Sequence, residues 1–167
     1  MRQAIYPGTF DPITNGHIDI VRKASNLFDK IYLCIAQTTD KKTLFSIDQR
    51  YLMCKDALSG FPNVEVISFV GLATSFAKKL NVTTIIRGLR AVSDFEYELQ
   101  LALTNKKMEN EIETLFFVPN YKFLYLSSSI VRQVYLNGGS IDGSVPDVVR
   151  QSFEQKSSKN LDHQTDV

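Results

Sequence analysis

The chain of 167 residues is 44% hydrophobic, which is enough to bury the core of one domain and little more. Its formal net charge of +1 argues against a general polyanion-binding protein, because such proteins usually concentrate Lys and Arg on one face or in a tail, and we expect no nucleic-acid partner. No apolar run approaches the roughly 18 residues of a membrane span and no signal peptide opens the chain, so we expect a cytoplasmic protein without membrane contact.

Short β-rich runs alternate with longer amphipathic runs from the N-terminus onward. The predicted strands are AIYPGTF, KIYLCIA, NVEVISF, VTTIIRG and ETLFFVP, and the helices between them cover about 15–28, about 47–58, ATSFAKKL and SDFEYELQLALTNKKM. This alternation implies right-handed crossovers and a parallel sheet with helices on both faces. We therefore predict an α/β fold with a Rossmann-like, doubly wound, five-stranded parallel sheet. In such sheets, ligands bind beyond the carboxyl ends of the strands, where the strand order reverses.

Two further helical segments follow the fifth strand. They are SSSIVRQVYLNGG, which ends at a Gly-Gly pair, and VPDVVRQSFEQK, which restarts near Pro146. We expect both to pack back onto the sheet and to complete a single domain over residues 1–156. Residues 157–167 are nearly all polar, which favours a disordered tail, and His163 within this tail receives no role.

The two cysteines, Cys34 and Cys54, lie in apolar segments without the spacing of metal ligands. We expect both to be buried, reduced thiols. The sequence shows no carboxylate cluster that would cage a cation, and we assign no residue as a metal ligand.

The segment YPGTFDPITNGH places one of the chain's two histidines where the first strand runs into a helix. Thr9 offers a hydroxyl beside free amides, and Gly16 allows close backbone approach. Either Thr14 or Asn15 can cap the helix that carries His17 in its first turn. Backbone N–H groups at a helix N-terminus hold a phosphate, and an imidazole there can bond the same group. The alternative is a structural His17 packed on the next helical turn, but its position after the first strand favours the anion site.

Two arginines follow the fourth predicted strand in the segment IIRGLRAVSDFEYE. Arg87 and Arg90 flank Gly88 at the carboxyl end of the strand, and guanidinium forks suit phosphate oxygens. Neither GxGxxG nor GxxxxGK occurs in the chain, so the usual dinucleotide fingerprint and the P-loop are absent.

The helix after these arginines has a predicted capping box formed by Ser93 and Glu96. Asp94 and Glu98 stand one turn apart, a mildly unfavourable spacing that the N-terminal helix dipole partly offsets. Both carboxylates could simply interact favourably with the positive N-terminal end of the helix dipole. Glu98 could instead bind a sugar hydroxyl or a base.

Two weaker signals complete the set. In LSSSIVR, one serine would serve as an ordinary N-cap, whereas three in a row offer a nest of hydroxyl and amide donors for a phosphate chain. In TDKKTLF, Lys41 and Lys42 follow the second strand and could be a solvated surface pair.

Taken in this order, these motifs resemble those of the bacterial phosphopantetheine adenylyltransferases, within the nucleotidyltransferase α/β-phosphodiesterase superfamily. The resemblance covers about 4–149. The superfamily signature T/H-x-G-H corresponds to residues 14–17, and the serine-rich signature to 127–132. YPGTFDPITNGH and IRGLRAVSDFEYE together resemble the phosphopantetheine branch specifically.

The resemblance implies the reaction that this family catalyses, a reversible transfer of the AMP part of ATP to 4′-phosphopantetheine that gives dephospho-coenzyme A and pyrophosphate. It also implies Mg²⁺ bound with ATP, held mainly by phosphates and water, and a homohexamer. His17 would donate to the α-phosphate region in the transition state. Feedback by coenzyme A stays open.

The resemblance also assigns site residues. Thr9 would lie between nucleotide and acceptor phosphate. The implied ATP-binding residues are Thr9, Phe10, His17, Gly88, Leu89, Arg90, Glu98, Phe123, Leu124, Tyr125, Leu126, Ser127, Ser128 and Ser129. The implied acceptor-binding residues are Thr9, Lys41, Ala73 and Arg87.

Two other functions remain open at the level of sequence. One is an adenylyltransferase of the same superfamily that acts on another phosphorylated acceptor. The other is a nucleotide sensor that binds ATP without turnover. His17, Lys41 and Arg87 together weigh against the sensor, because sensing needs no clamp for an acceptor phosphate.

Overall fold

The strands and helices of the computed structural model, which describes residues 1–37 and 42–162, follow one another in the predicted order. The strands are β1 (Gln3–Gly8), β2 (Lys30–Ala36), β3 (Val64–Phe69), β4 (Thr84–Gly88) and β5 (Glu113–Phe117). The helices are α1 (Asn15–Ser25), α2 (Ile47–Ala57), α3 (Ala73–Lys79), α4 (Val92–Met108), α5 (Ser128–Leu136) and α6 (Asp147–Asp162), with a 3-10 turn η1 (Tyr121–Phe123) before α5.

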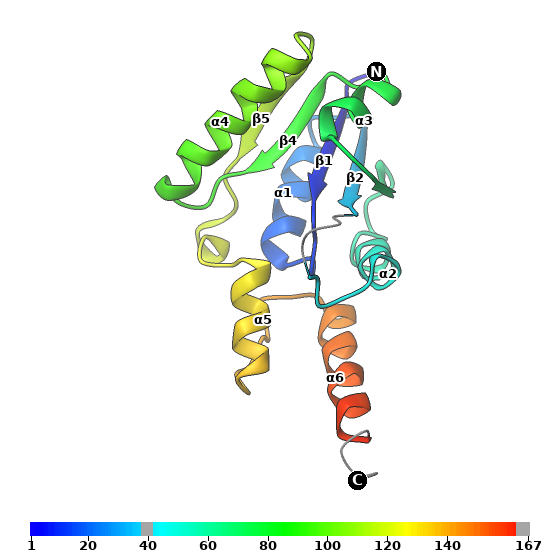
Figure 1. Ribbon diagram of the computed structural model, residues 1–167, viewed down its shortest axis with the longest axis vertical. Coiled ribbons are helices and arrows are strands. Elements are labelled where there is room, and N and C mark those ends of the chain that lie inside the picture. Colours follow the sequence, from blue (N-terminus) through cyan, green and yellow to red (C-terminus); the bar gives the residue numbers. More distant parts are fainter. Residues whose placement is uncertain (38–41, 163–167) are drawn as a thin grey trace.

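The five strands form one parallel sheet in the order β3-β2-β1-β4-β5 (Figure 1). The chain moves outward from β1 to β3 and then crosses back to β4, so the strand order reverses between β1 and β4. This arrangement confirms the predicted doubly wound α/β fold. It also fixes the edge at which a ligand site is expected, beyond the carboxyl ends of β1 and β4.

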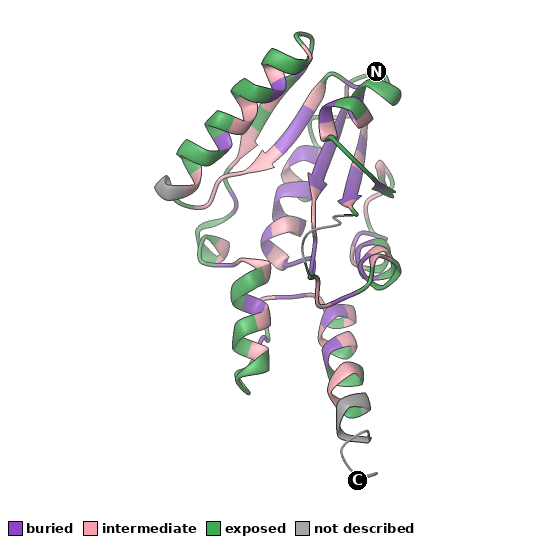
Figure 2. Ribbon diagram, in the orientation of Figure 1, coloured by how far each residue is buried: buried purple, intermediate pink, exposed green. Residues whose placement is uncertain are grey.

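The apolar core is divided between the two faces of the sheet. One cluster joins β1 and β2 to α1, α2 and α6, and includes Leu33, Met53 and Phe153. The other joins the opposite sides of the strands to α3, and includes Ile5 and Ala77. Successive strand residues point to opposite faces, so the same strands feed both clusters. Figure 2 shows the central strands buried and α4 largely exposed.

Both cysteines are buried and free, as predicted. Cys34 lies in the cluster under α3, and Cys54 lies in the cluster under α1 and α2. Burial raises the pKa of each thiol to about 12. Within residues 1–37 and 42–162, no helix combines the length and apolar character needed to cross a bilayer.

The last two helices extend beyond the carboxyl ends of the strands (Figure 1). The Phe153 ring of α6 packs edge-on against Phe45, with centroids 5.0 Å apart, and lies 4.4 Å from the Tyr135 ring of α5. The Tyr135 hydroxyl also lies 3.0 Å from the Ser157 hydroxyl. Helix α6 itself continues past Ser157 to Asp162, into the segment for which we predicted a disordered tail.

The start of α4 differs from the prediction. The helix begins at Val92 with Ala91 at its N-cap, and the Asp94 N–H donates to the Ala91 carbonyl. Ser93 therefore stands inside the first turn instead of before it, and the predicted capping box of Ser93 and Glu96 is wrong. Among the side chains that the structure describes, none forms a capping hydrogen bond at this end of the helix.

Candidate active site

The sheet opens between β1 and β4 at its carboxyl edge. In the described part of the chain, the ladder between these strands consists of the pair Ile5 and Ile85. Pro7 follows two residues later and has no N–H to continue the ladder. A cavity of about 560 Å³ occupies the opening, and its wall includes Pro7, Arg87 and Gly88.

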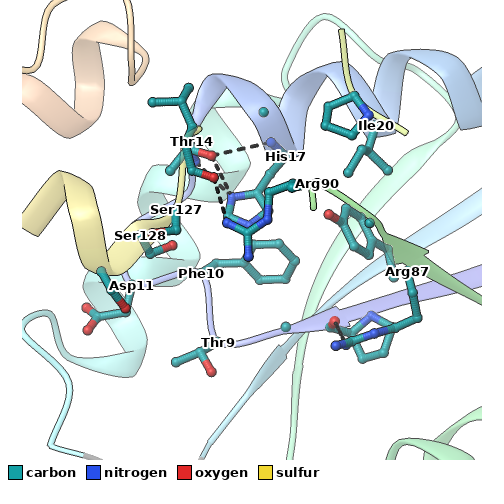
Figure 3. A pocket seen from close by; sticks show the side chains of 18 of the residues that line it. Thr9, Phe10, Asp11, Thr14, His17, Ile20, Arg87, Arg90, Ser127 and Ser128 are labelled. Carbon is teal, nitrogen blue, oxygen red and sulfur yellow. Dashed lines mark hydrogen bonds between the residues drawn. The ribbon is translucent and has the colours of Figure 1, made fainter. Parts of the chain in front are cut away.

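The cavity brings together most of the residues expected from the sequence. Those that line it are Thr9, Phe10, His17, Arg87, Gly88, Arg90, Glu98, Leu126, Ser127, Ser128 and Ser129. They come from the segment after β1, from α1, from β4 and the segment after it, from α4 and from the start of α5, which lie far apart in the sequence. Figure 3 shows His17 facing the Phe10 ring, with Thr9 and Arg87 farther along the same opening.

Five of the expected residues that the structure describes do not line the cavity, and a sixth is not described. Leu89 borders a shallow apolar pocket beside it. Phe123 belongs to η1, and Leu124 and Tyr125 follow it as exposed residues. Ala73 begins α3, next to the outermost strand β3, two strands away from β1. Lys41 lies outside the described residues.

His17 is fixed by the start of its own helix. Thr14 is the N-cap of α1, and its hydroxyl accepts from the His17 N–H at 3.4 Å. The Thr14 N–H in turn donates to His17 Nδ1 at 3.0 Å (Figure 3). A backbone N–H can only donate, so Nδ1 carries no proton and the neutral imidazole holds its proton on Nε2. The reciprocal cap therefore sets the tautomer of His17.

The surroundings of His17 disfavour its protonated form. Burial of the ring, with the positive charges of Arg90 and Arg87 nearby, lowers its pKa to about 3. The Phe10 ring packs edge-on against the imidazole at a centroid distance of 5.1 Å. At neutral pH the group is consequently an uncharged hydrogen-bond donor through Nε2, held in one orientation.

Two helix N-termini meet at the cavity. Gly16 in the first turn of α1 and Ser127–Ser129 at the start of α5 all line it. The Ser127 hydroxyl caps α5 by accepting from the Ile130 N–H at 3.1 Å. The Ser128 hydroxyl donates to the Pro12 carbonyl at 2.7 Å. With these hydroxyls engaged, what the serine segment offers an anion is chiefly its helix-terminal amides.

Arg87 and Glu98 form a two-pronged ion pair on the β4 side. Arg87 Nε donates to Glu98 Oε2 at 2.7 Å, and Nη2 donates to Oε1 at 2.6 Å. The two side chains are 22% and 10% exposed. Burial lowers the pKa of Arg87, but the Glu98 hydrogen bonds outweigh it, so the net shift is upward. Glu98 thus holds the guanidinium at the cavity wall, and its predicted contact with the nucleotide stays a prediction.

Arg90 connects β4 to the segment before α5. Its Nη1 donates to the Leu126 carbonyl at 2.6 Å, and its Nε lies 3.5 Å from the Asp94 carboxylate. Asp94 stands in the first turn of α4, where a carboxylate also suits the helix dipole. Arg90 therefore holds the serine segment against the carboxyl end of β4.

Asp11 is a site residue that sequence reasoning missed. Its two carboxylate oxygens accept the Leu44 N–H at 2.8 Å and the Phe45 N–H at 2.9 Å. Arg132 of α5 lies 3.4 Å from the same carboxylate and also donates to the Asp11 carbonyl. Asp11 therefore joins the segment before α2 to the start of α5. Lys42, which precedes this segment, lines the cavity.

The carboxylates of the cavity are already engaged. Asp11 accepts from two backbone amides, and Glu98 faces Arg87. In the described part of the chain, no group of three or more His, Cys, Asp or Glu side chains could hold a metal ion.

Comparison with known proteins gives a consistent family. The sequence profile of the cytidylyltransferase-like family matches residues 5–134. A phosphopantetheine adenylyltransferase from Clostridium tetani is 51% identical and covers 95% of this chain and 99% of its own length. One from Dictyoglomus thermophilum is 48% identical and covers 93% and 95%. The solved structure of a putative nicotinate-nucleotide adenylyltransferase from Vibrio parahaemolyticus shares the fold, with a TM-score of 0.68 over 90% of this chain and 91% of its own at 15% identity. The chain belongs to the phosphopantetheine adenylyltransferases, within the cytidylyltransferase-like family.

Proposed function

We propose that this chain transfers the adenylyl group of ATP reversibly to 4′-phosphopantetheine, giving dephospho-coenzyme A and pyrophosphate, a late step of coenzyme A biosynthesis. The observation that carries the proposal is the single cavity in which a neutral, oriented imidazole meets two helix N-termini and two guanidinium groups. Family membership supports the same reaction. Each feature favours phosphate chemistry, and together they suit a reaction between two phosphorylated substrates.

The nucleophile in this reaction needs no strong base. A phosphate monoester has a second pKa of about 6, so one of its oxygens is ready to attack at neutral pH. The new bond forms between that oxygen and the α-phosphorus of ATP, and the bond from the α-phosphorus to the pyrophosphate oxygen breaks. We propose that His17 Nε2–H donates to the α-phosphate as charge develops on it. An imidazole without its own charge can do this without titrating near neutral pH.

The two substrates would divide the cavity. We propose that ATP lies along the helix N-termini and Arg90, with contacts from Thr9, Phe10, Gly88, Leu89, Glu98 and residues 123–129. The acceptor phosphate would lie against Arg87 and Thr9, with Lys41 and Ala73 completing its site. Mg²⁺ would enter as part of the MgATP substrate, since the carboxylates that line the cavity are engaged by protein donors.

Three finer assignments rest on less specific support. We propose a homohexamer, supported by exposed apolar side chains along α4 and the edge strand β5, among them Phe95, Tyr97, Leu103 and Leu115. We propose the cytoplasm, supported by two free thiols. Coenzyme A contains the skeleton of the product dephospho-coenzyme A, so we also propose that it competes for the same cavity.

The deciding experiment is pyrophosphate release with ATP and a set of phosphorylated acceptors. We expect release with 4′-phosphopantetheine and none with pantetheine, because the phosphate supplies both the nucleophile and the contact with Arg87. Turnover with a different acceptor alone would assign another adenylyltransferase of this superfamily. ATP binding without turnover on any acceptor would assign the nucleotide sensor.

A further inference from the structure

Arg50 is a charged side chain in the core that lies behind the cavity wall. It stands in the first turns of α2, four residues after the N-cap Ser46, and only 3% of it is exposed. Its Nη1 donates to the Thr9 carbonyl at 2.6 Å and to the Ala36 carbonyl at 3.1 Å. Those carbonyls lie at the carboxyl ends of β1 and β2. Arg50 therefore fixes the chain at the point where it leaves the sheet and enters the site.

Stability alone does not account for this arginine. The buried Nε of Arg50 has no hydrogen-bond partner in the part of the chain that the structure describes. Burial lowers the pKa of Arg50, and the nearby Asp11 carboxylate opposes that shift. Burying a charged side chain costs free energy of desolvation, and the unpartnered Nε recovers none of that cost. Arg50 therefore carries a desolvation cost, and its visible structural effect is to fix the Thr9 and Ala36 carbonyls.

The contact with Thr9 determines where the next amide points. In a trans peptide, the carbonyl of one residue and the N–H of the next point in opposite directions. The Thr9 carbonyl faces Arg50, so the Phe10 N–H faces away from Arg50. Among the described residues, no acceptor takes the Phe10 N–H. Thr9 and Phe10 both line the cavity, whereas Arg50 does not.

The backbone at Phe10 is also unusual. Phe10 has a φ of 46°, in the left-handed region that a residue with a side chain rarely adopts. Its ring is held edge-on between Tyr6 at 5.5 Å and His17 at 5.1 Å. Such left-handed residues can turn neighbouring amides toward a common anion. The strained conformation is therefore maintained on both sides, by ring packing and by the grip on Thr9.

We infer that Arg50 is a positioning residue for adenylyl transfer, which aims the Phe10 N–H at the reacting phosphate by holding the Thr9 carbonyl on its other side. This inference rests on the proposed function for the identity of the reaction. The Phe10 N–H and the His17 Nε2–H would then both donate to the phosphate in the same pocket. Arg50 itself touches no substrate, so its effect passes through one peptide unit.

The test compares Arg50→Met and Arg50→Lys with Met53→Ala. Met53 lies on the same helix and is buried in the adjoining core, and among the described residues no hydrogen bond joins it to Thr9, so its variant controls for loosened packing. In Arg50→Met we expect kcat per folded molecule to fall about 10- to 100-fold at saturating ATP and 4′-phosphopantetheine. Calorimetric Tm should fall as well, because the Thr9 and Ala36 carbonyls lose their donor. Arg50→Lys keeps the positive charge but lacks the forked guanidinium, so its kcat should lie between those of Arg50→Met and the parent. Met53→Ala should lower Tm and keep kcat per folded molecule within about twofold.

A second readout follows the amide itself. With ¹⁵N-labelled phenylalanine, and the Phe10 resonance assigned from a Phe10→Leu spectrum, ATP alone should shift the Phe10 amide strongly in the parent and weakly in Arg50→Met. This measurement does not need turnover, so it tests the inference even if 4′-phosphopantetheine proves not to be the acceptor. An Arg50→Met enzyme with parental kcat per folded molecule would overturn the inference, and so would a Met53→Ala enzyme that loses as much kcat at a similar loss of Tm. If Arg50→Met does not fold, a folded Arg50→Lys with parental kcat overturns it equally.

Discussion

The two walls of the cavity are built on different principles. On the α1 wall, His17 is neutral and is fixed through a backbone N–H and the N-cap Thr14. On the β4 wall, Arg87 is charged and is fixed by the side chain of Glu98. The first arrangement is local, within one helical turn. The second joins two elements through an ion pair 11 residues apart in the sequence.

This difference indicates what each wall can contribute. A donor fixed by its own backbone stays in place when substrate arrives, which suits a contact that strengthens only in the transition state. A guanidinium held by a carboxylate can share its remaining donors with a phosphate, so its main contribution is binding. The α1 wall should therefore govern kcat, and the β4 wall should govern substrate affinity.

The largest effect should come from the α1 wall. We expect His17→Ala to lower kcat by about 10²-fold or more, because it removes an oriented donor at the reacting phosphate. ATP affinity, measured by calorimetry, should change little. His163→Ala, at the chain's other histidine, is the matched control and should behave as the parent. Near-parental kcat in a folded His17→Ala protein would remove His17 from the mechanism.

The next largest effect should come from the acceptor side of the β4 wall. Arg87→Ala should lower kcat/KM for 4′-phosphopantetheine roughly ten- to a hundredfold, the loss of one charge-assisted contact of about 1.5–3 kcal/mol. Lys41→Ala should also lower kcat/KM for 4′-phosphopantetheine. ATP binding should be much less affected in both variants.

Arg87→Ala also leaves the Glu98 carboxylate buried without its partner, which lowers stability for a separate reason. The double variant Arg87→Ala with Glu98→Gln removes that charge. It should recover Tm without recovering acceptor affinity. If these variants lost ATP binding and kept acceptor affinity, Arg87 and Lys41 would have to be assigned to the nucleotide instead of to the acceptor phosphate.

A smaller effect is expected at Arg90. Arg90→Ala removes the bond to the Leu126 carbonyl and one positive charge beside the nucleotide, so KM for ATP should rise about tenfold. KM for the acceptor should change less. Arg90→Lys keeps the charge and separates the two contributions. If Arg90→Ala instead raised mainly the KM for the acceptor, Arg90 would belong to the acceptor site and its assignment to ATP would be wrong.

The fold and one half of the site could be predicted from sequence because their signals are local. Alternating strands and helices, Gly16 and the serine segment each lie within a few residues of what they determine. The helix N-termini at the cavity follow from those signals. The opening between β1 and β4 at Pro7 was not predicted, because the β1–β2 ladder continues past the same proline.

The remaining features depend on residues that meet only in three dimensions. Asp11 holds amides 33 and 34 residues away, and Arg50 holds a carbonyl 41 residues away. The capping box at Ser93 was wrong for a different reason, because α4 begins at Val92 with Ala91 at its N-cap although the local pattern favours a later start. Arg87 and Glu98 were assigned to different substrates from sequence, whereas in the folded protein each is the other's partner.

The smallest expected effect is a pH dependence that does not change when His17 is replaced. The pKa of His17 is about 3, so the imidazole should remain neutral throughout the range from pH 5 to 8. The acceptor phosphate has a second pKa of about 6 and becomes a poorer nucleophile below it. We expect kcat/KM for 4′-phosphopantetheine to decrease as the pH is lowered below about 6, in the parent and in His17→Gln alike. The two profiles should share the same inflection pH and differ in their plateau values. An inflection present in the parent and lost in His17→Gln would mean that His17 titrates during turnover.

The same pKa makes a separate statement about stability. The folded-state pKa of His17, about 3, lies below the value of 6.5 for a free side chain, so on acidification the unfolded chain takes up this proton first. Its contribution to stability is fully present above about pH 6.5 and is lost progressively as the pH falls toward 3. The parent should therefore lose free energy of unfolding relative to His17→Gln between pH 7 and pH 5, as measured by urea titration at each pH. If the difference in free energy of unfolding between the parent and His17→Gln stayed constant over this range, the imidazole would already be free to accept a proton in the folded protein. His17 could then no longer be described as an uncharged donor held in one orientation.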